Sequence, residues 1–446
     1  MNNLKDDNMN IKLATVFNKN ELTVEEAFEK AKLVLDKKQG FVQKFLKLPN
    51  FNDEPKYFFY TAYTKKSSLH PSFTSGGCSL NETKAQMKAL VEAIERYSVY
   101  LYERRKFLRT SYTKINNKAL DPTTITSFSE TQLKTKRFKF FRVGKNSILK
   151  WICGTSLISG KPVLIPAQLT SLSYEFEENE PLIRIPITTG IAASTSMAGG
   201  IVRGIWENVE RDAFMITYLN KLKRDRIIID DSHIEYILSL FSRYKLEVYF
   251  FDITTDIGIP VILSVIIDRT SKGPAVCIGI KCSLDVKEAL IGSLEEAAMT
   301  RLNRRKIFIT ENIKPKRFPN GHKDRALYWS HPKMIKHLNF LIKSENCKDF
   351  TKIKNYKGNT ISNLKKTIKI LKKKNIETVF VDITKPLIRK YEFHVAMVSM
   401  PELQPLYLSE RYPYFGGRRL YTVPKNLGYT DKETTEDELN KIPHPF

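Results

Sequence analysis

The stretch KALVEAIERY, residues 88–97, decides how this chain is organised. It contains the pattern E-x-x-E-R, and residues three and four apart share one face of an α-helix, so these acidic and basic side chains project together. The pattern returns at residues 207–211 (ENVER) and is followed by an aspartate. A third apolar helix, expected over residues 285–303, carries Glu296 and Arg301. Acidic and arginine side chains on three otherwise apolar helices are the main clue to function.

Each E-x-x-E-R copy has two interpretations. Glu92 with Arg96, and Glu207 with Arg211, have the i,i+4 spacing of ordinary ion pairs on exposed helices. Both copies are embedded in apolar residues, however, and a carboxylate on an apolar helix face is costly to bury unless it is paired. The repetition therefore favours a functional site over a surface ion pair.

The two copies together supply four carboxylates that would repel one another unless cations bind. Divalent ions such as Mg²⁺ take oxygen ligands and also hold substrate phosphates. Arginines on the same helices offer forks for phosphate groups. We therefore predict a Mg²⁺–nucleotide ligand, outside the P-loop class because the sequence contains no G-x-x-x-x-G-K-[ST]. The carboxylates are Glu92, Glu95, Glu207 and Glu210, and the arginines are Arg96, Arg211 and Arg301.

Composition restricts the class of protein. The 446 residues, 42% of them hydrophobic, suit a folded protein of two or three packed subdomains. No secretory signal pattern opens the sequence, and aspartates interrupt the most apolar run, 248–268, so we expect a cytoplasmic protein without a membrane span. Five cysteines without a C-x-x-C pair predict free thiols and no zinc site.

The net charge of +25 has several interpretations. A solvated, lysine-rich surface is the favoured one. An anionic substrate, either a nucleotide or an acidic peptide, is the alternative. Nucleic-acid binding is not expected, since no helix-turn-helix, zinc finger or aromatic–basic RNA motif accompanies the charge.

Periodicity and turn signals predict a mixed α/β (α+β) fold. Residues 72–79 are expected to form a turn-rich loop, whose Gly76-Gly77-Cys78-Ser79 run is either an ordinary turn or, less favoured, an anion cradle before a helix. Residues 311–358 are expected to be loop-rich. The predicted helices span 24–37, 82–105, 197–221, 285–303 and 362–374. The predicted strands span 57–63, 150–156, 162–169, 246–252, 260–267, 275–280, 378–383 and 394–400.

Three runs of sequence resemble the signature helices of the YcaO family. They are residues 77–97, residues 188–211 and residues 296–301. The ending Pro443-His444-Pro445-Phe446 is similar to the proline-rich tail of the azoline-forming cyclodehydratase branch. The resemblance implies a YcaO-type fold with mixed sheets, packed helices and pseudo-duplicated signature helices. We expect a catalytic domain over 71–446, preceded by a helical and strand prelude over 1–70.

The resemblance implies ATP-dependent chemistry on a ribosomal precursor peptide. A Cys, Ser or Thr side chain attacks the preceding amide carbonyl, ATP phosphorylates the resulting oxygen, and phosphate leaves to give a thiazoline or oxazoline. The four glutamates would hold Mg²⁺ and the nucleotide, and the tail residues Pro443, Pro445 and Phe446 would order the active site or help proton transfer. The remaining nucleotide-site residues implied are Arg96, Arg211, Glu296 and Arg301.

Some positions depart from the family pattern. Many members have lysine at Cys78, serine at Lys88 and glutamine at Met299. Many also have asparagine near Thr195 and glutamate near Gly199, a residue that cannot ligate a metal through a side chain. These departures bear on nucleotide binding, so a nucleotide-poor scaffold subunit is one alternative function. The other is a YcaO enzyme that forms thioamides or amidines.

The resemblance also implies partners. Fused cyclodehydratases carry a domain similar to ubiquitin-activating enzymes that binds the peptide leader, and residues 1–70 are too few to encode it. We therefore expect a separate leader-binding partner similar to ubiquitin-activating enzymes. A flavin dehydrogenase is a further expected partner in some systems, and the protein itself is expected to form a homodimer. No nucleic acid and no membrane are expected as partners.

Overall fold

The computed structural model describes residues 13–66, 72–100, 107–310 and 319–446. Its strands form three sheets, with the orders β1-β2-β3, β11-β10-β9-β8-β12 and β4-β5-β13-β14-β7, and β6 pairs with β5. The strands are β1 (Val42–Leu48), β2 (Phe58–Thr64), β3 (Thr74–Ser79), β4 (Leu108–Ser111), β5 (Ile148–Ser156), β6 (Pro162–Pro166), β7 (Ile191–Ser194), β8 (Asp225–Ile228), β9 (Leu246–Asp252), β10 (Val261–Asp268), β11 (Val276–Cys282), β12 (Cys347–Asp349), β13 (Val379–Asp382) and β14 (His394–Ser399).

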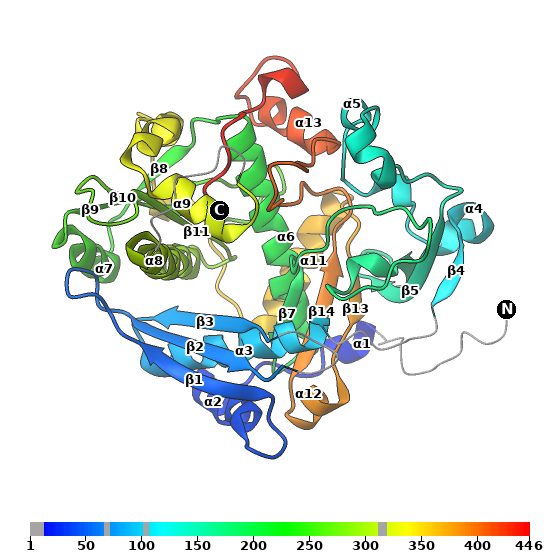
Figure 1. Cartoon of the computed structure of the whole chain (residues 1–446), viewed down its shortest axis with the longest axis horizontal. Coiled ribbons are helices and arrows are strands. Elements are labelled where there is room, and N and C mark those ends of the chain that lie inside the picture. Colours follow the sequence, from blue (N-terminus) through cyan, green and yellow to red (C-terminus); the bar gives the residue numbers. More distant parts are fainter. Residues whose placement is uncertain (1–12, 67–71, 101–106, 311–318) are drawn as a thin grey trace.

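Helices fill the space between the sheets and cover their outer faces (Figure 1). They are α1 (Leu13–Val16), α2 (Val24–Ala31), α3 (Glu82–Tyr100), α4 (Tyr112–Ile115), α5 (Glu130–Leu133), α6 (Met197–Leu219), α7 (Ser232–Ser242), α8 (Val286–Thr310), α9 (His322–Ser330), α10 (Asn339–Ile342), α11 (Thr360–Lys373), α12 (Pro386–Lys390) and α13 (Arg418–Asn426). The predicted α/β (α+β) class with mixed sheets and packed helices is confirmed.

Helix α6 runs through the middle of the molecule (Figure 1). Ser196 caps its start by accepting the Gly199 N–H at 3.1 Å. Apolar residues surround the helix on nearly every side, and it packs against β7 and β14 of one sheet and β11 of another. A helix that is apolar all round belongs in the interior, so α6 joins the sheets into one core.

The strands agree with their sequence patterns. Every residue of β10 (VILSVIID) is buried, as expected for an apolar, β-branched strand between two neighbours. The hairpin predicted around Ser159-Gly160 is present as β5 and β6, with Trp151 opposite Pro166. The lysine-rich helix is α11, which starts after the N-cap Asn359 and buries its apolar stripe.

The turn-rich loop predicted over residues 72–79 is wrong, because these residues form β3. Glycine serves helix packing here and not a turn: a β-carbon on Gly77 would lie 1.9 Å from the carbonyl oxygen of Ala85 in α3. The anion cradle proposed for the same residues is not formed, because they are part of a strand and the Gly76 N–H already donates to the Glu92 carboxylate at 2.7 Å.

Two other predicted elements have different boundaries. The stretch expected to be loop-rich contains α9, α10 and β12, whose apolar residues are separated by polar ones over too short a span to give a clear period. The first signature helix was predicted to reach residue 105, and its last five predicted residues lie outside the described part of the chain.

The predicted prelude contributes to a sheet of the predicted catalytic domain. β1 and β2 come from residues 1–70, and β2 pairs antiparallel with β3, with Phe59 opposite Cys78. The division of the chain into a prelude and a catalytic domain at residue 70 stays a prediction. None of the helices in the described segments is long and apolar enough to cross a membrane.

Candidate functional site

Three strand–helix units meet at the centre of the molecule: β3 with α3, β7 with α6 and β11 with α8. Each of these strands lies at the end of its sheet, so one row of its backbone N–H groups has no neighbouring strand. In every unit a glutamate of the following helix accepts a backbone N–H from the strand or, for β7, from the residue just before it. The bonds are Gly76 N–H to Glu92 (2.7 Å), Gly190 N–H to Glu207 (2.9 Å) and Ile280 N–H to Glu296 (2.8 Å), over separations of 16, 17 and 16 residues.

The second glutamate of each E-x-x-E-R pattern joins its unit to the next one. Glu95 of α3 accepts the Ala193 N–H of β7 at 2.9 Å, and Glu210 of α6 accepts the Cys282 N–H of β11 at 2.8 Å. The equivalent residue of α8 is Met299, three after Glu296. It packs against Gly76 of β3, where a β-carbon would lie 3.1 Å from the Met299 Cε atom. The three units therefore follow one another around the site.

We call Glu92, Glu95, Glu207, Glu210 and Glu296 the glutamate array. The structure brings these five predicted site residues to one place, held by hydrogen bonds to strand edges. Each one uses a single carboxylate oxygen for its backbone bond. The second oxygens of Glu95, Glu210 and Glu296 accept no hydrogen bond from the described residues, and so can bind a ligand.

The arginines of the two E-x-x-E-R patterns lie among these carboxylates. Arg96 donates to Glu92 at 2.7 and 3.0 Å, and Arg211 donates to Glu207 at 3.2 Å. The Nε and Nη1 atoms of Arg211 are buried and have no hydrogen-bond partner within the described segments. A buried guanidinium with free donors is uncommon and indicates a place for an anion.

Burial and crowding disturb the titration of the array. Burial, with the nearby charges of Glu92 and Glu207, raises the pKa of Glu95 to about 8. Burial likewise raises the pKa of Glu207 and of Glu296, against the attraction of Arg211 and with repulsion from Glu210. Glu95 therefore holds a proton at neutral pH unless a cation replaces it.

The site is recessed but open to water. The Glu207 and Arg211 side chains remain 25% and 11% exposed, although burial dominates the pKa shift of Glu207. Lys281 of β11 is 38% exposed, and its ammonium lies 3.3 Å from Glu210. Side chains that are surrounded by protein and still reach solvent line a recess that a ligand can enter.

The donor set fits Mg²⁺ with a nucleotide better than a metal held by protein alone. Within the described residues, no group of three or more His, Cys, Asp or Glu is arranged to hold a metal ion. Mg²⁺ is usually bound by one or two carboxylates together with substrate phosphates and water. Free carboxylate oxygens and the free Arg211 donors match that arrangement.

The C-terminal tail docks beside Arg211. The Pro443 carbonyl accepts hydrogen bonds from the Tyr218 hydroxyl (3.0 Å) and the Trp329 indole N–H (2.9 Å). Arginines bind the next two carbonyls, Arg325 that of His444 (3.0 Å) and Arg304 that of Pro445. The ring of Phe446 then lies 4.1 Å from the Arg211 guanidinium, a cation–π contact. Of the predicted tail residues, Phe446 thus lies against Arg211, while Pro443 and Pro445 belong to the docked segment that leads to it.

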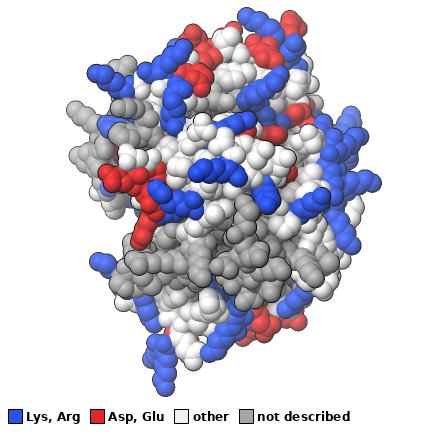
Figure 2. Space-filling view, turned by 90° about the vertical axis from the view of Figure 1, so that its right-hand side faces the viewer, with Lys and Arg blue, Asp and Glu red and all other residues white. Residues whose placement is uncertain are grey.

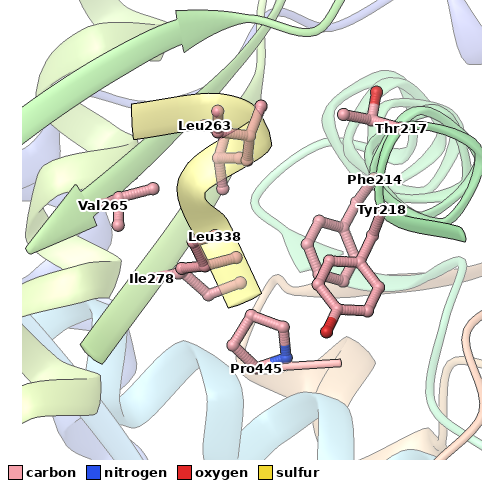
Figure 3. Close-up of a pocket in the computed structure, with 9 residues that line it drawn as sticks. Phe214, Thr217, Tyr218, Leu263, Val265, Ile278, Leu338 and Pro445 are labelled. Atoms are coloured by element: carbon pink, nitrogen blue, oxygen red, sulfur yellow. The ribbon is translucent and has the colours of Figure 1, made fainter. Parts of the chain in front are cut away.

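A small apolar cavity of about 10 Å³ lies behind the tail, between Pro445, α6 and the β10–β11 sheet (Figure 3). Phe214 and Tyr218 face it from α6, and Leu263 and Ile278 face it from the sheet. The cavity is far too small for a nucleotide. It shows instead that the tail closes the hydrophobic core and is packed on its inner side.

Arg301 does not join the site, contrary to the sequence-based expectation. Its guanidinium donates to Glu54 (2.7 Å) and Asp268 (2.8 Å), and it is almost fully buried. Five residues at about 100° each put Arg301 roughly 140° around α8 from Glu296, whereas Arg96 and Arg211 follow their glutamates by four residues. The Glu296 and Arg301 pair therefore never had the spacing of the other two pairs.

The other departures from the family pattern have structural explanations. Lys88 reaches across to α8 and donates to Glu295 at 2.5 Å and to the Cys78 carbonyl at 3.2 Å. Burial raises the pKa of the Cys78 thiol well above its ordinary value, which argues against a nucleophilic cysteine.

Sequence reasoning missed two cations of this site, Lys281 and Arg203. The Glu210 carboxylate, with Glu296 and Glu288 behind it, raises the pKa of Lys281. The one available signal was a lone lysine inside the apolar strand VCIGIKC. Arg203 had none, because an arginine one turn before Glu207 on an apolar helix is also an ordinary ion-pair partner.

The chain belongs to the YcaO family. The family pattern described as YcaO cyclodehydratase, ATP- and Mg²⁺-binding, matches residues 76–404. The predicted family is therefore confirmed, and ATP and Mg²⁺ are its cofactors.

Known proteins support the same fold. A heterocyclase in complex with substrate and cofactor has a TM-score of 0.80 at 20% identity and covers 95% of this chain and 57% of its own. YcaO from Methanopyrus kandleri, bound with AMPPCP and Mg²⁺, gives 0.61 at 16% identity, covering 86% and 92%. The E. coli microcin synthetase McbBCD complex gives 0.59 at 14% identity, covering 80% and 88%.

Two curated relatives have higher identity over shorter alignments. One is an uncharacterized protein in the tfuA 3′ region of Rhizobium leguminosarum bv. trifolii, 31% identical over 166 residues, 34% of this chain. The other is an uncharacterized protein of Methanothermobacter thermautotrophicus, 27% identical over 246 residues, 53% of this chain. The matched region spans 39% and 60% of the lengths of these relatives.

Proposed function

We propose that this protein is an ATP-dependent cyclodehydratase that converts Cys, Ser or Thr residues of a ribosomal precursor peptide to thiazolines or oxazolines. The observation that carries the proposal is the position of Arg211 within the glutamate array. The buried, unpaired donors of Arg211 favour a bound anion, and the crowded carboxylates of the array favour a bound cation. A Mg²⁺–nucleotide provides both, since its phosphates are anionic and its metal ion is cationic.

In this proposal the glutamate array and the cations share the work. Glu92, Glu95, Glu207, Glu210 and Glu296 hold Mg²⁺ and orient the nucleotide. Arg96, Arg211 and Lys281 bind phosphate oxygens and neutralise their charge. Arg301 is left out, because its donors are used by Glu54 and Asp268.

The amide oxygen of the peptide is a poor leaving group, and that is the barrier to ring formation. Bound ATP supplies the phosphoryl group that lets this oxygen depart as phosphate after the peptide side chain has attacked the carbonyl carbon. The tail excludes water beside Arg211 and fixes the orientation of its guanidinium through Phe446. Pro443 and Pro445 limit the freedom of the chain there, and so order that wall of the site.

The partners belong to the proposal as well. Lysine and arginine side chains are spread over the face shown in Figure 2, while acidic ones gather in a few places. With a net charge of +25, such a surface suits an acidic leader peptide or a leader-binding partner protein, and it speeds their association. We propose that the protein acts in the cytoplasm as a homodimer, with a separate leader-binding subunit and, in some pathways, a flavin dehydrogenase.

Mass spectrometry of the peptide product tests the proposal. The protein, its partner and a candidate precursor peptide are incubated with ATP and Mg²⁺, and the expected product is lighter by one water for each ring. Replacement of an oxygen by sulfur in the product mass would instead identify a thioamide-forming enzyme. Peptide binding without ATP consumption would identify a scaffold subunit.

A further inference from the structure

The segment before α2 contacts the first turns of α6, the helix that carries two glutamates of the array. Its residue Glu21, separated from α6 by about 180 positions in the sequence, sits beside Gly199 in the first turn of that helix. We propose that Glu21 is a positioning residue of the nucleotide site, which supplies the carboxylate that position 199 lacks and fixes Arg203 at the end of the glutamate array. This proposal rests on the proposed function.

The Glu21 carboxylate is held on both oxygens. Arg203 binds it with both terminal nitrogens, at 2.5 and 2.8 Å, as a bidentate pair. Ser194 donates to one oxygen, and Thr360 donates to the other at 2.8 Å. Although burial opposes ionisation, Arg203 and these hydroxyls lower the pKa of Glu21 to about 2. The carboxylate is therefore charged at any physiological pH.

Gly199 makes room for this carboxylate. A β-carbon at residue 199 would lie 2.3 Å from the Ser194 Oγ atom and 2.5 Å from the Glu21 Oε1 atom, both closer than non-bonded atoms approach. Any side chain at position 199 would therefore displace Glu21. The glycine and the glutamate from the distant segment are complementary, and together they put a negative charge at the start of α6.

Arg203 connects Glu21 to the array. Gly199, Arg203, Glu207 and Arg211 follow one another at intervals of four residues, so they form one stripe along α6. Burial opposes the charge of Arg203, yet Glu21, Glu288 and Glu95 together raise its pKa, so all three carboxylates lie around it. Its side chain is 46% exposed, which leaves its outer face open to a ligand in the recess. Among the described residues, Glu21 provides the hydrogen bonds that fix the Arg203 guanidinium, so the guanidinium would be free to rotate without it.

The segment has attachments that do not involve Glu21. Val16 is buried in the core, and Phe17 packs under the ammonium of Lys365 at 5.5 Å. The Leu22 N–H donates to the Thr195 hydroxyl at 3.0 Å. A substitution at Glu21 therefore leaves the segment attached, and its effect on the nucleotide is separable from unfolding.

Calorimetric titration with Mg²⁺ and AMPPCP tests the proposal on the full chain. Glu21→Gln and Glu21→Ala are expected to weaken binding roughly 10- to 100-fold, the usual effect of losing a group that orients a ligand-binding side chain. Gly199→Ala is expected to weaken binding as well, because its β-carbon displaces both the Glu21 carboxylate and the Ser194 hydroxyl that donates to it. Glu26→Gln is the matched control: the same charge change five residues on, in the capping box of α2, should bind like the unchanged protein.

A relocated carboxylate separates positioning from a merely structural role. In Glu21→Ala/Gly199→Glu the charge returns to the first turn of α6 from the helix itself, and binding should recover at least in part. Affinities of the Glu21 variants within twofold of the unchanged protein, with Glu207→Gln defective, would overturn the role of Glu21 and leave the nucleotide site intact. If the unchanged protein binds no Mg²⁺–AMPPCP, the proposed function falls, and this inference falls with it.

Discussion

The α6 unit and the α8 unit have the same plan but a different chemical content. Both place a first glutamate, Glu207 or Glu296, on the edge of the strand before the helix. In α6 the residues three and four positions after this glutamate are Glu210, which accepts an N–H of the neighbouring strand β11, and Arg211, which binds Glu207. In α8 they are Met299 and a threonine, and Met299 packs on Gly76. The comparison teaches that a carboxylate, Glu95 or Glu210, contacts the next strand at two junctions, whereas Met299 makes a packing contact at the equivalent position of α8. The charge of the α8–β3 junction lies instead at Glu295, which accepts hydrogen bonds from Ser79 and Lys88.

Removing charge from α6 should have the largest effect. Glu207→Gln and Glu210→Gln keep an oxygen that accepts the strand-edge N–H, but lose the negative charge that attracts Mg²⁺. We expect ATP turnover to fall by roughly 100-fold or more, because a charge that holds the metal ion beside the transferred phosphate is lost. The melting temperature should change little. Steady-state phosphate release measures the first quantity, and circular dichroism the second. Full turnover in either variant would mean that α6 does not bind the metal.

The pH dependence follows from Glu95, whose pKa is raised to about 8 from an ordinary 4.5. Without ligand, the folded protein holds this proton more tightly than the unfolded chain, so that contribution to stability is complete below pH 4.5 and disappears as the pH rises through 8. Mg²⁺ competes with the same proton, so Mg²⁺–nucleotide affinity should rise about 25-fold between pH 6.5 and 8.5, in step with the ionised fraction of Glu95.

Calorimetry in buffers of different ionisation enthalpy counts the proton released on binding. Glu95→Gln should abolish both the release and the pH dependence. An affinity that is flat across this range in the unchanged protein would show that Glu95 is already ionised in the free state.

Loss of the tail aromatic should have a moderate effect. Phe446→Ala removes a cation–π contact with Arg211 that is worth about 0.5–2 kcal/mol. We expect KM for ATP to rise about 2- to 30-fold, because Arg211 is no longer fixed. Phe446→Trp keeps an aromatic face and serves as the matched variant. Equal kinetics for Phe446→Ala and the unchanged protein would separate the tail from nucleotide binding.

Met299, the packed position of the α8–β3 junction, should be the least sensitive residue of the site. Met299→Leu conserves volume at a packing contact, so it should change stability by less than about 1.5 kcal/mol and leave ATP kinetics within twofold. Glu210→Gln, at the equivalent position of α6, is the comparison. A loss of turnover in Met299→Leu as large as that in Glu210→Gln would erase the distinction between charged and packed positions.

The sequence predicted the long helices α3, α6, α8 and α11 and the apolar strands β9, β10, β11, β13 and β14 because their apolar patterns were strong, but it did not predict α7. It placed α6 within two residues of its observed end, and it paired β5 with β6 across a Gly-containing turn. It failed at β3, since four small residues look like a turn when the helix that packs on them is not known. Glycine at position 77 is explained only by the Ala85 carbonyl above it.

The glutamates of the candidate site could be predicted from the sequence, but the contacts that hold its other side chains in place could not. Repetition of E-x-x-E-R identified Glu92, Glu95, Glu207 and Glu210, and the structure brings them together with Glu296. No local pattern could show that Glu21 reaches Gly199, because the contact joins residues 178 positions apart, the difference between 199 and 21. Arg301 failed for the opposite reason, since a residue type was matched without its helical phase.

A crystal structure of the protein grown with Mg²⁺ and AMPPCP tests the three-unit site most directly. We predict phosphate density beside the free Nε and Nη1 atoms of Arg211, with Mg²⁺ on carboxylates of the glutamate array, among them Glu207 or Glu210. Nucleotide bound elsewhere, with the Arg211 donors still unpaired, would contradict the assignment of the array as the Mg²⁺–nucleotide site.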